Sequence, residues 1–267
     1  MPNGAAAPVP ALRRANAQRF EATWRRTHPG PGALPAREVF DALVAHYAEP
    51  FRTYHTLGHV DDGLARLDVV SHLVGTPDAI EIALWFHDVL CDPGARDNEM
   101  RSARWYLARS AGTTPRFRIA VCRMILASRH IAPAIRADAR YMVDIDLAGF
   151  GHPWLEFRRT TDLVRGEFPH KSDAEFARGL APFLRSLVAR PSMYGTDFFR
   201  ERCEATARRN VSQLLAEYRD AGNLTPSAKS GVGRERPRTL TSPIGWYANA
   251  SAPAPWRVAS ETMIRVP

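Results

Sequence analysis

Apolar side chains recur at intervals of three and four residues along most of this 267-residue chain. That spacing places them on one face of a helix, whereas a strand facing water on one side alternates apolar and polar residues. No segment combines such alternation with paired turn signals, and no internal repeat is visible. The pattern therefore predicts an all-α fold.

The ends of the expected helices follow from proline, glycine and capping residues. Gly75 closes one helix, Pro77 and Pro115 suit first turns because their missing N–H costs nothing there, and Asp97 is the expected N-cap of the helix that contains Glu99. The expected helices cover residues 11–28, 36–48, 57–74, 78–90, 98–111, 115–128, 141–150, 154–167, 173–189 and 197–218.

The periodicity divides the chain into three parts. Residues 1–10 are rich in alanine and proline and are expected to form a flexible leader. Residues 11–220 are expected to form one helical bundle domain. In residues 221–267 any periodicity is interrupted by Pro226, Pro237, Pro243, Pro253 and Pro255, with serine, glycine and arginine between them, so a disordered tail is predicted.

The charge and the cysteines limit the classes of partner. The tail carries six basic and two acidic residues, half of the net charge of +8, and much of the other arginine lies at the spacing of a solvated helix face. We therefore do not expect a nucleic-acid partner. No stretch approaches the roughly 18 apolar residues of a membrane span, and the first residues do not resemble a secretory signal. Three distant cysteines indicate reduced thiols and a cytoplasmic protein. A homodimer stays open.

The chemistry is concentrated in the segment 78–90, DAIEIALWFHDVL. Its second half is apolar on nearly all sides, so we expect it to be buried, yet it contains His87 and Asp88 side by side. A buried carboxylate is costly unless it is paired, hydrogen-bonded or bound to a metal. A divalent metal ion near the end of this helix would compensate both residues.

Two other segments offer further ligands. His55 and His59 lie one helical turn apart, and Asp144 and Asp146 lie within an apolar stretch. Mixed imidazole and carboxylate ligands suit Mn²⁺, Fe²⁺, Co²⁺, Ni²⁺ or Zn²⁺ better than Ca²⁺, with Mg²⁺ as a further option. His-Thr-Leu-Gly-His lacks the glutamate that follows the first histidine in zincin proteases.

The order His, then His-Asp, then Asp resembles the HD superfamily of metal-dependent phosphohydrolases. The sequence is more narrowly similar to a bacterial branch of predicted HD phosphohydrolases with a Tyr-His-x-x-x-His start. The resemblance extends over residues 36–218. The motifs that carry it are RTYHTLGH (52–59), WFHD (85–88), DNEMRSA (97–103) and DIDL (144–147), with Arg165, Glu167, Arg178, Gly179 and Asn210.

The resemblance implies His59, His87, Asp88 and Asp146 as metal ligands. Asp146 is preferred to its neighbour because the last ligand of the superfamily usually follows an apolar or alanine residue. The neighbour, Asp144, then becomes a partner of the ligands. Cys91 stands where this branch usually has an aromatic residue, so altered packing near the metal is expected.

Other residues keep more than one interpretation. Arg52 is either a phosphate clamp or part of a surface salt bridge. His55 contacts phosphate, binds a second metal or hydrogen-bonds a helix end, and His130 binds a second metal or caps a helix. Asp88 or Glu99 would take a proton during catalysis, although a helix N-terminus also explains Glu99.

These features predict an enzyme that hydrolyses a phosphate monoester or diester of a nucleotide or a related small phosphorylated metabolite. One alternative is a di-iron oxygenase of the HD type, in which His55 and His130 would hold the second iron. The other alternative is a non-catalytic module that binds a nucleotide in the same pocket.

Overall fold

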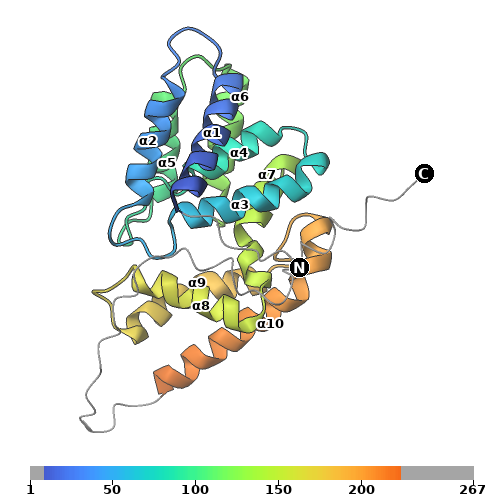
Figure 1. The fold of residues 1–267 in the computed structure, drawn as a ribbon. Coiled ribbons are helices and arrows are strands. Elements are labelled where there is room, and N and C mark those ends of the chain that lie inside the picture. The colour runs from blue at the N-terminus through green and yellow to red at the C-terminus, as the bar shows by residue number, and fades with distance from the viewer. Residues whose placement is uncertain (1–8, 224–267) are drawn as a thin grey trace, which may run out of the picture.

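The computed structural model describes residues 9–223, and within that part every regular element is a helix (Figure 1). The predicted all-α class is therefore confirmed. The α-helices are α1 (Val9–Thr27), α2 (Ala36–Tyr47), α3 (Leu57–Val70), α4 (Pro77–Phe86), α5 (Asn98–Arg109), α6 (Pro115–Ala127), α7 (Ala137–Leu147), α8 (Trp154–Gly166), α9 (Asp173–Val188) and α10 (Asp197–Asn223). Two short 3₁₀ helices, η1 (Ser71–Leu73) and η2 (Ala148–Gly151), follow α3 and α7.

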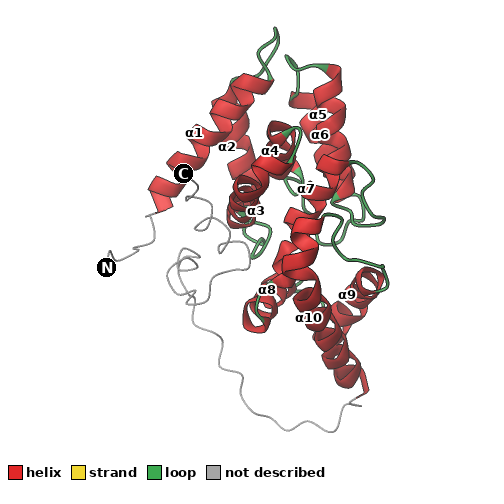
Figure 2. Cartoon of the chain, turned by 90° about the vertical axis from the view of Figure 1, so that its right-hand side faces the viewer, coloured by secondary structure: helices red, strands yellow, loops and turns green. Residues whose placement is uncertain are grey.

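The helices form two groups joined by α7. Helices α1–α6 form the first group. Within it, α4 packs against α1, α3, α5 and α6, and α4 also packs against α7. Helices α8, α9 and α10 lie at the other end, where η2 packs on α8 and α10 (Figures 1 and 2). Because α7 contacts α3, α4 and α6, side chains on α3, α4 and α7 can meet at one point.

Helix α4 is the centre of the core because its sequence is apolar on all sides. Every residue from Ala79 to Phe86 is buried, and Pro77 occupies the first turn as predicted. One charged residue in this run, Glu81, was not predicted to be buried. Its carboxylate accepts hydrogen bonds from Arg19 at 2.9 Å and from the hydroxyl of Thr23 at 2.8 Å. An ion pair therefore compensates this buried charge.

The prediction that this helix continues to residue 90 was wrong. Helix α4 ends at Phe86, and His87 is its C-cap. The carbonyls of Asp88 and Val89 accept hydrogen bonds from the guanidinium of Arg52 instead of from a further helical turn. The two functional residues thus lie where the chain leaves the helix.

Other helix ends also differ from the prediction. Helix α3 ends at Val70 and gives way to η1, and Asp97 sits at the N-cap of α5 without a side-chain capping bond. Helix α1 begins at Val9, inside the predicted leader, and α10 continues to Asn223, inside the predicted tail. The rest of the leader, residues 1–8, and of the tail, residues 224–267, lies outside the described residues. The limits of a single domain stay a prediction.

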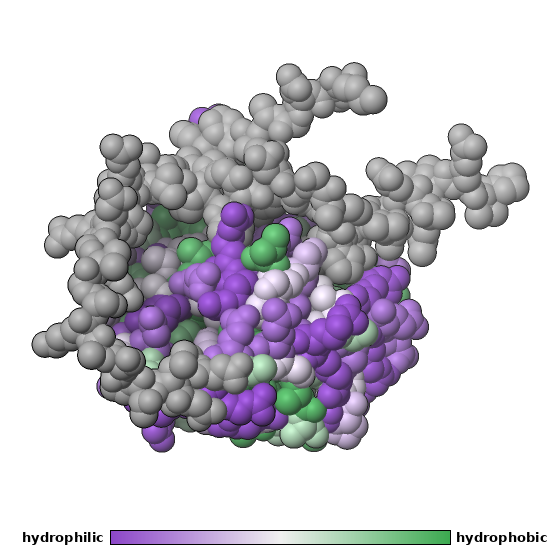
Figure 3. Space-filling view, turned by 90° about the horizontal axis from the view of Figure 1, so that it is seen from below, coloured by the Kyte–Doolittle hydropathy of each residue, from purple (hydrophilic) through white to green (hydrophobic). Residues whose placement is uncertain are grey.

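Three further observations concern the hydropathy of one face, the state of the cysteines and the hydrophobicity of the helices. The part of the face formed by α8–α10 that Figure 3 leaves uncovered is mainly hydrophilic, with small separate hydrophobic areas. All three cysteines are free thiols. Within residues 9–223, no helix combines the length and hydrophobicity that a membrane crossing requires.

An aromatic cluster holds α1 against the core and contains a buried histidine. The ring of His28 stacks on Trp24 with centroids 3.7 Å apart and meets Tyr106 and Phe117 edge on. Burial, with a smaller contribution from Arg118, lowers the pKa of His28 to about 4. The folded protein therefore keeps this imidazole neutral at a pH where an unfolded chain would protonate it.

This difference predicts a pH-dependent loss of stability. Because the unfolded chain binds a proton near pH 6.5 and the folded chain only near pH 4, stability falls as the pH decreases through that window, by up to about 1.4 kcal/mol per pH unit. His28→Phe keeps an aromatic ring on Trp24 and should remove this part of the pH dependence. Urea unfolding at several pH values measures both proteins; equal slopes against pH would contradict the assignment.

Candidate metal centre

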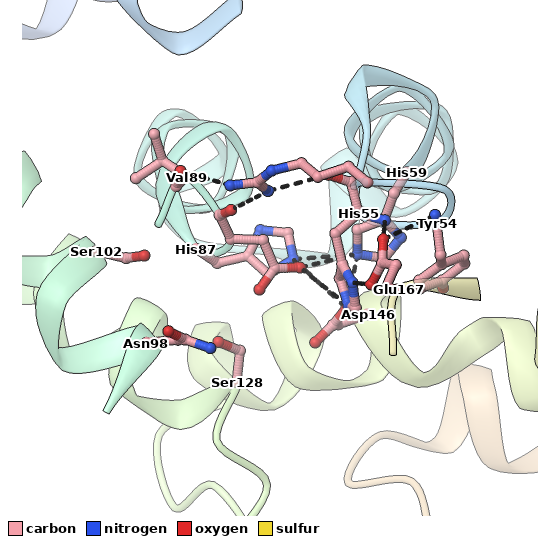
Figure 4. Close-up of polar contacts among 12 residues, drawn as sticks. Tyr54, His55, His59, His87, Val89, Asn98, Ser102, Ser128, Asp146 and Glu167 are labelled. Carbon is pink, nitrogen blue, oxygen red and sulfur yellow. Dashed lines mark hydrogen bonds and ion pairs between the residues drawn. The ribbon is translucent and has the colours of Figure 1, made fainter. Parts of the chain in front are cut away.

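Four side chains from three helical segments meet at one point. His59 lies in the first turns of α3, His87 and Asp88 lie at the end of α4, and Asp146 lies on α7 (Figure 4). The Nε2 atoms of His59 and His87 are 3.2 Å apart. Asp88 Oδ2 lies 3.0 Å from His87 Nε2 and 3.5 Å from His59 Nε2. Asp146 Oδ1 lies 3.2 Å and 3.6 Å from the Nε2 atoms of His59 and His87.

These separations are those of donors around one ion. Metal–ligand bonds of about 2.0–2.2 Å place neighbouring donors about 2.8–3.6 Å apart in octahedral or tetrahedral geometry. The five separations between 3.0 and 3.6 Å lie within this range. The structure therefore gathers His59, His87 and Asp88 within 4.8 Å of one another and places Asp146 against both imidazoles, while their binding of a metal stays a prediction.

Hydrogen bonding fixes the form of one imidazole. His87 Nδ1 lies 2.9 Å from the carbonyl oxygen of Leu84. Since a carbonyl only accepts, Nδ1 carries the hydrogen, and Nε2 of the neutral ring presents a lone pair to the other donors. Metal-binding histidines are oriented in this way by their second nitrogen.

Electrostatics also favour a cation at this point. Burial opposes a charge on His87, but Asp88 and Asp146 outweigh it and raise the pKa of the imidazole. Burial likewise opposes ionisation of both carboxylates, and the surrounding histidines nevertheless lower the pKa of Asp88 and Asp146. Both carboxylates are thus ionised at neutral pH, and their charge matches one divalent ion.

Glu167, at the C-terminal end of α8, organises the segment that leads into α3. Its Oε1 accepts hydrogen bonds from the backbone N–H groups of Thr53, Tyr54 and His55, at 2.9–3.0 Å. Its Oε2 lies 2.6 Å from Nδ1 of His55. No local pattern predicts this role, because Glu167 lies 112 positions away from His55; Glu167 was named only among the residues that carry the HD resemblance.

The far side of the centre is held by α5. The hydroxyl of Ser102 accepts a hydrogen bond from the N–H of Leu90, and the amide of Asn98 bonds both backbone groups of Asp92. These contacts fix the chain directly after Asp88. Asn98 and Ser102 lie on this side of the centre in Figure 4.

Arg52 forms an ion pair with Glu49, as one interpretation expected, but at a buried position and not on the surface, and its contacts leave the phosphate clamp without support. Its side chain is 0% exposed. Its guanidinium donates to the carboxylate of Glu49 and to the carbonyls of His55, Asp88 and Val89, at 2.7–3.0 Å. Arg52 therefore joins the loop before α3 to the end of α4 and has no free face for a phosphate.

Asp144 is not a partner of the predicted ligands. It is completely buried, and its carboxylate accepts hydrogen bonds from the N–H of Gly195 and from the N–H and hydroxyl of Thr196, at 2.6–2.8 Å. Burial raises its pKa to about 6 although these bonds act in the opposite direction. This carboxylate attaches α7 to the loop before α10.

His130 contacts the centre, whereas Glu99 does not. His130 Nε2 lies 2.9 Å from Asp146 Oδ2, and its φ of 53° is uncommon for a residue with a side chain. Its buried Nδ1 has no hydrogen-bond partner among the described residues. Arg190 donates to its carbonyl. Glu99 pairs with Arg129 at 3.9 Å, and no hydrogen bond or ion pair in residues 9–223 connects it to the four ligands.

Comparison with protein-family models finds no match for this chain, and searches of curated proteins and of solved structures find none either. The similarity to the HD superfamily therefore rests on the motif residues alone, and membership stays a prediction.

The different roles of the two neighbouring aspartates can be separated by matched variants. Asp146→Asn should lower the affinity for metal by at least about 100-fold, because it removes a ligand rather than an outer contact. Asp144→Asn places an amide N–H₂ against backbone donors and should lower the free energy of unfolding by about 1–3 kcal/mol, with metal affinity retained. Chelator competition and urea unfolding of the metal-free proteins measure the two effects. Equal loss of metal affinity in both variants would contradict this division.

Arg52→Lys should lower the free energy of unfolding by about 2–4 kcal/mol, because one ammonium group cannot satisfy four separated acceptors. Metal affinity should fall as well, since the carbonyl of Asp88 loses its donor. Arg37→Lys, at an exposed pair with Asp41, serves as the control and should change stability by less than about 0.5 kcal/mol. A stable Arg52→Lys protein with only a raised KM would restore the phosphate-clamp interpretation.

Proposed function

We propose that this chain is a metal-dependent phosphoric ester hydrolase that acts on a nucleotide or a related small phosphorylated metabolite. One observation carries the proposal: the Nε2 atoms of His59 and His87 lie 3.2 Å apart, and each lies within 3.6 Å of a carboxylate oxygen of both Asp88 and Asp146. The phosphorylated substrate follows from the motif resemblance, and the choice between monoester and diester is left to experiment.

The four ligands leave one side of the centre accessible. The side chains of His87 and His59 are 1% and 6% exposed, whereas Asp146 is 12% and Asp88 is 19% exposed. We therefore expect the substrate to approach from the side of Asp88. Four protein donors leave room in a five- or six-coordinate sphere for water and a phosphoryl oxygen.

The residues of the centre would have different roles in the reaction. A bound divalent ion would supply a nucleophilic hydroxide at neutral pH and positive charge beside the phosphoryl oxygens. Asp88 is the carboxylate on the accessible side and is better placed than Glu99 to accept the proton of that water. His130 holds the outer oxygen of Asp146 and so fixes the direction of the other oxygen. Arg52 contributes by positioning Asp88.

A di-iron oxygenase is the second candidate, and one observation favours it. Two additional imidazoles contact the carboxylates: His55 Nε2 lies 3.9 Å from Asp88, and His130 Nε2 lies 2.9 Å from Asp146. Two irons per chain together with oxygen uptake that depends on a substrate would support the oxygenase against the hydrolase. The non-catalytic module ranks below both because all four ligands are present.

A screen of metals against substrates tests the proposal. Metal-stripped protein should hydrolyse at least one nucleotide, cyclic nucleotide or sugar phosphate only after addition of Mn²⁺, Co²⁺, Ni²⁺, Fe²⁺ or Mg²⁺. His87→Ala and Asp88→Ala should each lower kcat/KM by at least about 100-fold, since each removes a ligand.

The matched control is His72→Ala, which removes an exposed imidazole in η1 and should keep full activity. Asp146→Ala protein provides the second negative control. Hydrolysis that persists in both His87→Ala and Asp88→Ala would show that the activity arises elsewhere and would favour the binding module.

A further inference from the structure

A second group of donors lies directly beside the four ligands. Ligand atoms of His55, Cys91 and Glu167 all lie within 4.8 Å of one another. His55 Nε2 is also 3.9 Å from Asp88 Oδ2, which belongs to the first centre. The two groups therefore adjoin at Asp88.

The imidazole of His55 is held in a ligand-like orientation. Its Nδ1 lies 2.6 Å from Glu167 Oε2, and Glu167 is itself fixed by three backbone N–H groups. Figure 4 shows the His55 ring beside Glu167. With the hydrogen on Nδ1, the lone pair is on Nε2, the ring nitrogen that lies 3.9 Å from Asp88 Oδ2. A histidine that donates one N–H to a carboxylate is the usual arrangement of a metal ligand.

Cys91 supplies a softer donor at the same place. Its half-buried thiol lines a cavity of about 330 Å³ together with Glu49, Phe51, Leu90, Asp92, Pro93 and Arg101. The chain on both sides of Cys91 is fixed by a hydrogen bond from the N–H of Leu90 to the hydroxyl of Ser102 and by one from the N–H of Asp92 to the amide oxygen of Asn98. The thiol is thus reachable from the cavity and held near His55.

We propose that Cys91 Sγ, His55 Nε2 and the carboxylate of Asp88 bind a second divalent ion that prefers sulfur, such as Zn²⁺, next to the first ion. A thiolate, an imidazole and a carboxylate suit Zn²⁺ or Co²⁺ and disfavour Mg²⁺ and Mn²⁺. Glu167 acts as a positioning residue for His55. Binding converts the thiol to a thiolate and releases its proton to solvent.

The proposal rests on the proposed function through Asp88, which would bridge the two ions. Two-metal sites that act on phosphate esters hold their ions about 3.5–4 Å apart, a spacing that one carboxylate can span. The sulfur ligand would make the second position selective for a different metal from the first.

Titration of the metal-free full-length protein with Co²⁺ tests the second site. We expect two equivalents per chain and a sulfur-to-cobalt charge-transfer band. Cys91→Ser should bind one equivalent and lose the band, whereas Cys122→Ser, at another half-buried cysteine, should behave like the unchanged protein. Mn²⁺ should fill only one position. Cys91→Ala, checked for helix content by circular dichroism, repeats the test without a hydroxyl.

A single equivalent without a sulfur band in the unchanged protein would overturn the second site and leave the first intact. A band that persists in Cys91→Ser would also overturn it. Failure of hydrolysis with every metal would instead count against the proposed function, since the stoichiometry and the band do not depend on turnover. The outcomes for the two proposals are therefore distinguishable.

Discussion

The cost of placing charge inside an apolar helical core governs this structure. A carboxylate that leaves water loses its hydration and needs hydrogen bonds or opposite charges to offset that loss. The chain provides them in three different ways. Glu81 pairs with Arg19, Asp144 accepts bonds from the Gly195–Thr196 backbone, and Asp88 and Asp146 face the imidazoles. Among these three, the last arrangement gathers donors with lone pairs around a common point, next to the further group of His55, Cys91 and Glu167, and for that reason it suits an ion.

The helices were predictable from the sequence because their apolar spacing is local information. The ends of the helices were less predictable. The helix with the His-Asp pair was expected to continue to residue 90, but it stops at Phe86. The carbonyl of Trp85 and the N–H of Leu90, which a longer helix would use, bond instead to the hydroxyls of Tyr47 and Ser102. A helix end that depends on a distant side chain leaves no local signal.

The dependence on distant contacts also explains which roles of the site residues could be predicted from the sequence. Asp144 and Asp146 lie in identical apolar surroundings in the sequence, and their partners are 52 and 16 positions away, in Thr196 and His130. The apolar context therefore identified both as compensated carboxylates without identifying the compensation. The partners of Arg52 were not predictable for a related reason: a guanidinium that binds backbone carbonyls cannot be distinguished in sequence from one that binds phosphate.

The position of the ligands explains why the sequence indicates a chemistry more readily than a substrate. His59, His87 and Asp146 are held by α3, α4 and α7, whose packing requires apolar residues at fixed spacing, so the ligands stand out against that background. Connecting segments also contribute to the centre: His130, between α6 and α7, contacts Asp146, and Arg52 and His55, between α2 and α3, contact Asp88. Polar residues are ordinary in such segments. Within these segments the contacts of Glu167, Arg52 and Ser102 decide which atoms face the centre. Substrate selection would therefore be determined by tertiary contacts that no periodic pattern encodes.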